Sequence, residues 1–197
     1  AGIKHQIALV TGGSQGFGEG IVRNLAEKGV NIVIADIKEE KGLELADELN
    51  TPSARNQIRV VQTDVSDDSS AEHCIYETIK QFGGLDLLIS NAGILKAGGL
   101  DEMDPATFEA ITKVNYMGYY LMARHASAVM KLQSQYKDNH VMDIIQINSK
   151  SGLVGSKKNF AYAGGKFGGI GLTQSFALEL MPYHIKVNSI CPGNFFE

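Results

Sequence analysis

Six short runs of Ile, Val and Leu alternate along the chain with longer stretches that have the apolar spacing of helices. The apolar runs cover residues 6–10, 31–35, 58–62, 85–90, 143–148 and 185–190. Their interiors are apolar rather than alternating, which is typical of strands buried on both faces of a parallel sheet. Helical spacing covers residues 18–27, 40–49, 69–81, 105–131 and 162–180. We therefore predict a single α/β domain over residues 1–197, with a doubly wound parallel sheet and helices on both faces.

The composition limits what such a domain binds and where it works. A chain of 197 residues with 44% hydrophobic residues has room for one ordinary core, and its net charge of -4 gives no basic excess for nucleic acid. No apolar run approaches the ~20 residues that cross a bilayer, and no charged-then-apolar leader precedes the first strand. Cys74 and Cys191 lack the CxxC spacing and predict neither a disulfide framework nor a metal site. We expect a cytoplasmic protein without membrane, metal or nucleic-acid partners.

A glycine-rich turn follows the first strand and opens the first helix. Its glycines have the spacing GxxxGxG rather than the commoner GxGxxG, and they allow backbone N–H groups to approach a pyrophosphate at the helix N-terminus. Many turns contain a glycine cluster, but few lie between a first strand and a first helix. We predict a dinucleotide site here, and its residues are Gly12, Ser14, Gln15, Gly16, Phe17 and Gly18.

The second strand ends at an acidic residue about 20 residues after the glycine turn. A carboxylate at Asp36, followed by Ile37, can accept hydrogen bonds from the adenosine ribose and would repel a 2′-phosphate. This favours NAD over NADP, although Lys38 lies close enough to leave NADP open. In the alternative interpretation, Asp36 is only an acidic residue that forms a turn or caps a helix, without a role in binding.

Polar and small residues also follow the third and fourth strands. Ligands of open α/β sheets bind beyond the carboxyl ends of the strands. We expect these residues to line the adenine and ribose part of the same groove: Asp64, Val65, Asn91, Ala92 and Gly93.

Tyr162 and Lys166 lie four residues apart on a predicted helix and therefore share a face. The chain holds a second such pair, Tyr76 and Lys80, so the spacing alone decides nothing. Only the pair at 162 and 166 follows the fifth strand, beside the predicted groove, where Ser149 ends that strand. A hydroxyl, a phenol and an ammonium suit hydride transfer at a carbinol carbon.

In that arrangement the neighbouring ammonium favours the phenolate of Tyr162, which takes the alcohol proton while hydride leaves for a nicotinamide. Ser149 would hold the substrate oxygen. Asn115, in an apolar helical stretch, has two interpretations: a satisfied core polar residue, or a relay of water or protons to Lys166.

Two predicted helices carry unusual residues. The segment 108–130 is apolar on most faces, and the segment 162–171 holds five glycines, at a cost of about 4–5 kcal/mol relative to alanine. Close approach of another backbone would offset that cost. We interpret the two segments as a subunit interface; the alternative is tight packing on the chain's own sheet.

Together these residues resemble the classical branch of the short-chain dehydrogenase/reductase family, over the whole chain. The resemblance implies a catalytic set of Asn115, Ser149, Tyr162 and Lys166, with NAD as the cofactor and a homodimer or homotetramer as the assembly. It also implies that Pro192, Gly193 and Asn194 lie near the nicotinamide, as Tyr162 and Lys166 do. Family members continue through a substrate-covering segment and a seventh strand, which we expect to be missing from a chain that ends at Glu197.

Within that family, the run INSKSG at 147–152 resembles the members that interconvert sorbitol 6-phosphate and fructose 6-phosphate with NAD. A lysine after the catalytic serine is unusual, and a phosphorylated substrate needs cations. Four lysines could form that rim, although each could equally be a solvated loop residue: Lys96, Lys150, Lys157 and Lys158. The sequence is also compatible with action on a different secondary alcohol or ketone, such as an unphosphorylated polyol or a hydroxyacyl chain, and with an NAD-sensing regulator without catalysis.

Overall fold

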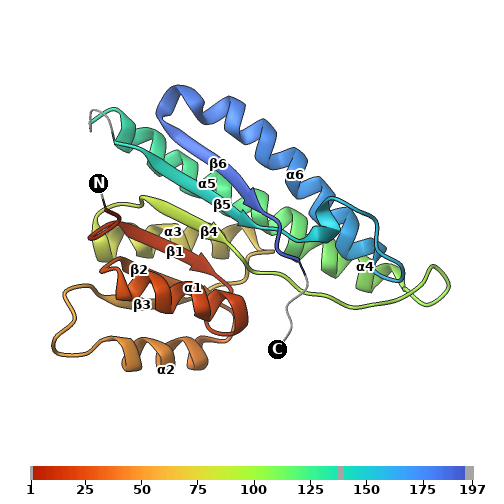
Figure 1. Ribbon diagram of the computed structural model, residues 1–197, viewed down its shortest axis with the longest axis horizontal. Coiled ribbons are helices and arrows are strands. Elements are labelled where there is room, and N and C mark those ends of the chain that lie inside the picture. The colour runs from red at the N-terminus through yellow and green to blue at the C-terminus, as the bar shows by residue number, and fades with distance from the viewer. Residues whose placement is uncertain (1, 137–139, 194–197) are drawn as a thin grey trace.

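The fold is a single parallel β-sheet between helical layers, and the computed structural model describes residues 2–136 and 140–193. The sheet order is β3-β2-β1-β4-β5-β6, and every pairing is parallel. This is the doubly wound, Rossmann-type order that the alternating pattern predicts (Figure 1). The strands are β1 (Ile7–Thr11), β2 (Asn31–Asp36), β3 (Ile58–Gln62), β4 (Leu87–Ser90), β5 (Met142–Ile147) and β6 (Ile185–Ile190).

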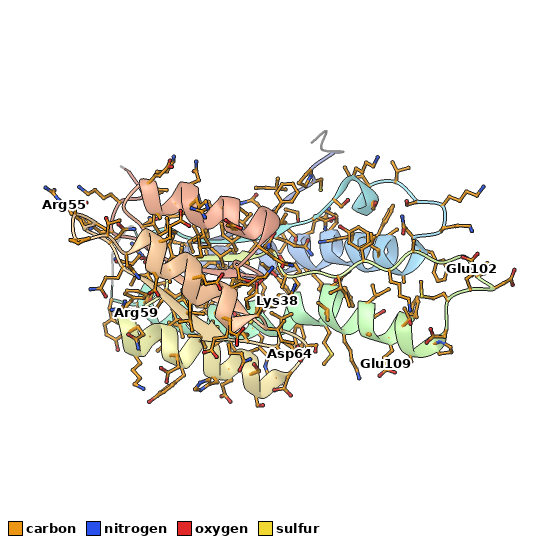
Figure 2. All side chains as sticks on the ribbon, turned by 90° about the horizontal axis from the view of Figure 1, so that it is seen from below. Lys38, Arg55, Arg59, Asp64, Glu102 and Glu109 are labelled. Atoms are coloured by element: carbon orange, nitrogen blue, oxygen red, sulfur yellow. The ribbon has the colours of Figure 1, made fainter. Side chains whose placement is uncertain are left out.

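The helices divide between the two faces of this sheet. Apolar residues of α1 and α2 pack on one face of β1 and β2, whereas α3, α5 and α6 pack on the other face. In the edge-on view of Figure 2, α1 and α3 lie on opposite sides of the sheet. The helices are α1 (Gly16–Glu27), α2 (Glu39–Leu49), α3 (Asp68–Phe82), α4 (Pro105–Thr112), α5 (Gly118–Ser134) and α6 (Phe160–Leu180), with short turns η1 (Lys113–Met117), η2 (Lys150–Gly152) and η3 (Met181–Tyr183). Among the described residues, no helix is both long and apolar enough to cross a membrane.

Local capping signals explain where several helices begin and end. The Asp67 carboxylate accepts a hydrogen bond from the Ser70 N–H (2.7 Å) at the start of α3, and Gly83 ends that helix with a left-handed φ of 82°. Asp104 accepts from the Thr107 N–H (2.9 Å) ahead of α4, with proline at the first helical position. These caps lie within one or two residues of the boundaries that the sequence predicts.

One predicted helix is interrupted. Residues 105–131 form α4, then the π-helical turn η1, then α5. Both ends of the Asn115 amide bond the backbone of Ile94, outside the helix. A π turn contains one more residue than an α-helical turn but does not change the direction of the helix. The apolar periodicity of the sequence therefore does not reveal it.

The prediction that all strands are buried on both faces was wrong for half of them. Strands β1, β2 and β4 are buried along nearly their whole length, but β5 and β6 alternate between buried and more exposed residues, and β3 is mostly half-buried. Ile190, for example, is 51% exposed. On one face of the sheet, helices α1 and α2 pack mainly on β1 and β2. In the described residues β6 is an edge strand, at the other end of the sheet from β3.

Candidate active site

A groove of about 710 Å³ lies at the carboxyl ends of strands β1 to β4. Lys38 and Asp64, which both line it, lie toward the same end of the sheet in Figure 2, and Arg55 lies at the opposite end. Most residues predicted to bind the dinucleotide line this groove: Gly12, Gln15, Gly16, Phe17, Asp36, Ile37, Asp64, Val65, Asn91, Ala92 and Gly93. The sequence pattern missed the small or apolar lining residues Ala35, Thr63, Ile94 and Val114, which have no chemical signature.

The glycine turn is shaped by close approach of two loops. Gly12 and Gly16 have left-handed φ angles of 62° and 56°. A Cβ on Gly12 would lie 2.9 Å from the Ala92 Cα, and one on Gly18 would overlap the Gly12 carbonyl oxygen. Asn91 holds the turn in place, because its Nδ2 donates to the Gly12 carbonyl oxygen at 3.1 Å. The turn therefore needs glycine for contact within the chain, at the N-terminus of α1.

Asp36 is buried behind this turn and fixed by two backbone donors. Its Oδ2 accepts from the Ser14 N–H (3.1 Å) and its Oδ1 from the Lys38 N–H (2.9 Å). Lys38 Nζ donates to Gln15 Oε1 at 2.9 Å, so this lysine side chain is held at the groove wall. The geometry combines a fixed carboxylate with a nearby ammonium.

Ser14 gives an independent test of whether the site fits a dinucleotide. Its side chain is 5% exposed, and its Oγ has no hydrogen-bond partner among the described residues. A buried hydroxyl without a partner is costly, which is consistent with a polar group that completes the site. With the N-terminus of α1 and the Asp36 carboxylate, the residues present fit a bound pyrophosphate and ribose.

Lys166 is buried beneath Tyr162 on α6. Its Nζ lies 5.5 Å from the centre of the Tyr162 ring and donates to the Ile147 carbonyl oxygen at 2.8 Å. Burial lowers the pKa of Lys166 to about 8, and the nearby Cys191 partly counters this. Tyr162 itself is half-buried. The predicted pair therefore places a cation beside a phenol that retains some access to solvent.

Ser149 follows β5 and caps the short turn η2, which packs against α6. Its Oγ accepts from the Ser151 N–H at 3.1 Å and its own N–H donates to Asn148 Oδ1 at 2.8 Å. The structure thus brings the turn that begins at Ser149 against the helix that carries Tyr162 and Lys166.

Asn115 lies in η1, against the same helix. Its Oδ1 accepts from the Ile94 N–H and its Nδ2 donates to the Ile94 carbonyl oxygen, both at 2.8 Å. The side chain is only 3% exposed, and each end of its amide makes one hydrogen bond to Ile94. These contacts fit the interpretation of Asn115 as a satisfied buried polar residue, and its relay to Lys166 stays a prediction.

The remaining predicted residues lie around the far end of β6 and on exposed loops. The Pro192 carbonyl oxygen accepts from the Lys150 N–H at 2.9 Å, Gly193 is exposed, and Asn194 lies outside the described residues. Lys158 pairs with Glu102 at 3.0 Å, and Lys96 bonds Thr107 at 3.3 Å. The side chains of Lys150 and Lys157 are exposed and make no hydrogen bond or ion pair with any residue that the structure describes.

The glycines of α6 separate into two kinds. A Cβ on Gly168 would lie 2.6 Å from the Tyr116 ring, and one on Gly169 would overlap the Gln146 amide, so these two need packing within the chain. Gly164 and Gly171 have nothing within 4 Å. Internal packing thus explains part of the glycine cluster, and the subunit interface stays a prediction.

The sequence profile of the short chain dehydrogenases matches residues 6–196. The chain belongs to the short-chain dehydrogenase family. Sorbitol-6-phosphate 2-dehydrogenase of Escherichia coli is 37% identical over 193 residues, covering 98% of this chain and 73% of that protein. Trans-4-hydroxycyclohexanecarboxylate dehydrogenase of Sinomonas cyclohexanicum is 35% identical, with the same coverage.

Solved structures of short-chain dehydrogenases have the same fold. Sorbitol-6-phosphate 2-dehydrogenase of Erwinia amylovora superimposes with a TM-score of 0.89 at 38% identity, covering 95% of this chain and 71% of that one. A 3-ketoacyl-(acyl-carrier-protein) reductase of Brucella melitensis, solved with NADH, has a TM-score of 0.90 at 27% identity, covering 97% and 76%. This chain is therefore an oxidoreductase of CH–OH groups in small molecules, and its family uses NAD or NADP.

Proposed function

We propose that this short-chain dehydrogenase uses NAD to interconvert sorbitol 6-phosphate and fructose 6-phosphate. Two proteins of that named activity are 37% and 38% identical to the chain. Identity alone does not select this substrate, because the Sinomonas relative is 35% identical and bears a different substrate in its name. The observation that carries the proposal is Lys150, an exposed cation next to Ser149 without a partner among the described residues.

The preference for NAD rests on Asp36. Its carboxylate lines the groove and is fixed by the Ser14 and Lys38 N–H groups, so it cannot readily turn away from a ribose. A 2′-phosphate at that position would be repelled by the negative charge of Asp36. This residue is buried, with only 7% of its surface exposed. Lys38 is bonded to Gln15 and offers that phosphate one competing cation.

Nicotinamide dinucleotide, when bound, supplies the hydride acceptor. The chain's own residues manage the proton and the substrate oxygen. Tyr162 takes the proton of the alcohol as general base, and the Lys166 ammonium lies 5.5 Å from the centre of its ring. Ser149 donates its hydroxyl hydrogen to the substrate oxygen and holds the carbinol carbon in place. In the reverse direction Tyr162 returns the proton to the carbonyl oxygen.

Lys150 would bind the phosphate group of the substrate. Its backbone N–H is tied to the Pro192 carbonyl oxygen, which holds the start of η2 against the end of β6. The side chain extends from that fixed point as a point charge. Lys158 and Lys96 have other partners in Glu102 and Thr107, so their contribution would require those exposed contacts to break.

A substrate panel tests this proposal. Purified protein is assayed with NAD and with NADP on sorbitol 6-phosphate, sorbitol, a hydroxysteroid and a hydroxyacyl thioester, and reduced cofactor is followed by absorbance. We expect NAD to be preferred and kcat/KM to be about 10-fold to 100-fold higher for sorbitol 6-phosphate than for sorbitol, since one charge-assisted contact contributes about 1.5–3 kcal/mol. Equal values for the two polyols would refute phosphate recognition. Cofactor binding without turnover on any alcohol would favour the regulator.

A further inference from the structure

Asn148 is a buried amide between the catalytic strand and the catalytic helix. It is 4% exposed and directly precedes Ser149. Its Oδ1 accepts from the Ser149 N–H at 2.8 Å, and its Nδ2 donates both to the Lys166 carbonyl oxygen at 2.9 Å and to Gln146 Oε1 at 2.8 Å. Every donor hydrogen of this amide is used.

These contacts fix the orientation of the amide. The Ser149 N–H can only donate and the Lys166 carbonyl can only accept, so one orientation of Asn148 satisfies both. One side chain therefore joins the backbone of Ser149, on the strand side, to the backbone of Lys166, on α6. The neighbouring Ile147 carbonyl oxygen accepts from Lys166 Nζ, so residues 147 and 148 hold that lysine at both its ends.

The surroundings of Asn148 are built to support it. Gln146 Oε1 accepts a second hydrogen bond from Ser189 Oγ at 2.9 Å, which anchors the glutamine to β6. A Cβ on Gly152 would overlap Asn148 Oδ1, and one on Gly169 would overlap the Gln146 amide. Two glycines thus leave the space that these two amides fill.

We infer that Asn148 is a positioning residue, which sets Ser149 relative to Lys166 and Tyr162 for the transfer step. The inference rests on the proposed function, because it assigns Ser149 and Lys166 to that step. Displacing groups by about 1 Å lowers turnover by about 100-fold in preorganised sites. Loss of the amide should therefore reduce catalysis more than it reduces binding.

The test uses Asn148→Ala, with Gly152→Ala as a second variant that crowds the same amide without altering it. The matched control is Asn56→Ala, another buried asparagine, whose Nδ2 donates to the Val30 carbonyl oxygen at 2.8 Å, where β2 begins. Each protein is assayed on the best alcohol of the panel, with and without deuterium at the carbinol carbon, and its affinity for NADH is measured by fluorescence.

We expect Asn148→Ala and Gly152→Ala to lower kcat by about 10-fold to 100-fold, with a larger isotope effect on kcat and with KM and NADH affinity within about 2-fold of the parent. Asn56→Ala should lose comparable thermal stability while keeping parental kinetics. The inference is overturned if folded Asn148→Ala keeps the parental kcat and isotope effect. If Asn148→Ala does not fold, parental values of kcat and isotope effect in Gly152→Ala overturn it instead.

A separate readout does not depend on the substrate. If the parent protein oxidises no alcohol, the proposed function fails, but hydrogen exchange at the Ser149 amide still decides whether Asn148 holds that residue. Faster exchange of this amide in Asn148→Ala, and not in Asn56→Ala, supports the inference. Equal protection of the Ser149 amide in both variants overturns it.

Discussion

The ammonium of Lys166 lies 5.5 Å from the centre of the Tyr162 ring and is fixed there by a 2.8 Å hydrogen bond to the Ile147 carbonyl oxygen. The lysine is 5% exposed, so water screens its charge weakly. A cation held in this way can stabilise negative charge that develops beside it during proton transfer. The relationship links the end of β5 to the chemistry proposed for α6.

Removing the phenol should stop turnover without loss of cofactor binding. In Tyr162→Phe the aromatic ring remains, but no group at that position takes the alcohol proton, and we expect kcat to fall by about 100-fold to 10,000-fold. NADH affinity, measured by fluorescence, should stay within a few-fold of the parent. Tyr76→Phe, in the other tyrosine–lysine pair, is the control and should keep full activity. Parental turnover in Tyr162→Phe would remove this residue from the mechanism.

Two glycines of α1 give a matched pair for the cofactor turn. A Cβ on Gly18 would overlap the Gly12 carbonyl oxygen, whereas Gly20 has nothing within 4 Å. Gly18→Ala should disrupt the turn and weaken NADH binding by at least about 10-fold. Gly20→Ala should leave binding unchanged and raise the free energy of unfolding by up to about 1 kcal/mol. Calorimetric titration with NADH checks both, and equal affinities would contradict the assignment of the turn.

Asp36 should control the choice between the two nicotinamide cofactors. In Asp36→Ala the repulsion of a 2′-phosphate is removed, while Lys38 remains at the groove wall. We expect the ratio of kcat/KM for NADP to that for NAD to rise by about 10-fold to 100-fold. Asp47→Ala, an exposed acid of α2, should leave that ratio unchanged. A ratio that does not move in Asp36→Ala would mean that this carboxylate does not face the ribose.

Burial of Lys166 makes stability depend on alkaline pH. Its pKa is about 8 in the folded protein, below the ordinary 10.5, so between these values the unfolded chain binds more protons. The cost of burying the charge is present below about pH 8 and is relieved as the pH rises toward 10.5. Relative to Lys166→Met, the parent should therefore gain up to about 3 kcal/mol over this range. Urea unfolding of the cofactor-free proteins at several pH values measures the difference, and a constant difference would contradict this.

Lys150 should distinguish phosphorylated from unphosphorylated polyols. We expect Lys150→Ala to raise KM for sorbitol 6-phosphate by about 10-fold while KM for sorbitol stays the same, because only the phosphorylated substrate loses a charge-assisted contact. Lys28→Ala, at the C-terminal end of α1, is the control and should change neither value. A similar rise for both polyols in Lys150→Ala would assign the lysine to structure instead.

The strand–helix alternation was enough to predict the fold class, because parallel strands and crossover helices leave strong apolar signals. The predicted first, second and fourth strands are buried on both faces as expected. The third, fifth and sixth strands were mispredicted in this respect. In the sixth strand the alternation is already present in the sequence, because Lys186 and Asn188 separate its apolar residues and are exposed. The apolar content of a strand shows that it can be buried on both faces, but it does not show whether helices cover both faces.

The sequence predicted the residues of the candidate site only where polar residues or glycines lie at the ends of predicted strands. The glycine turn and Asp36 follow strand ends, so topology alone brings them to one groove. The sequence did not predict the π turn at Asn115 or the positioning role of the Asn148 amide. Both depend on contacts with residues distant in the sequence: Asn115 bonds Ile94, and Asn148 bonds Lys166. Such contacts are set by tertiary packing and have no local pattern.

The most direct measurement follows one deuterium atom. The protein is incubated with NAD and sorbitol 6-phosphate deuterated at C2, and the reduced cofactor is analysed by mass spectrometry. We predict that the deuterium appears in the reduced cofactor, one atom for each fructose 6-phosphate formed, and that Tyr162→Phe transfers almost none in the same time. Absence of deuterium from the cofactor, or equal transfer by Tyr162→Phe, would contradict hydride transfer at this site.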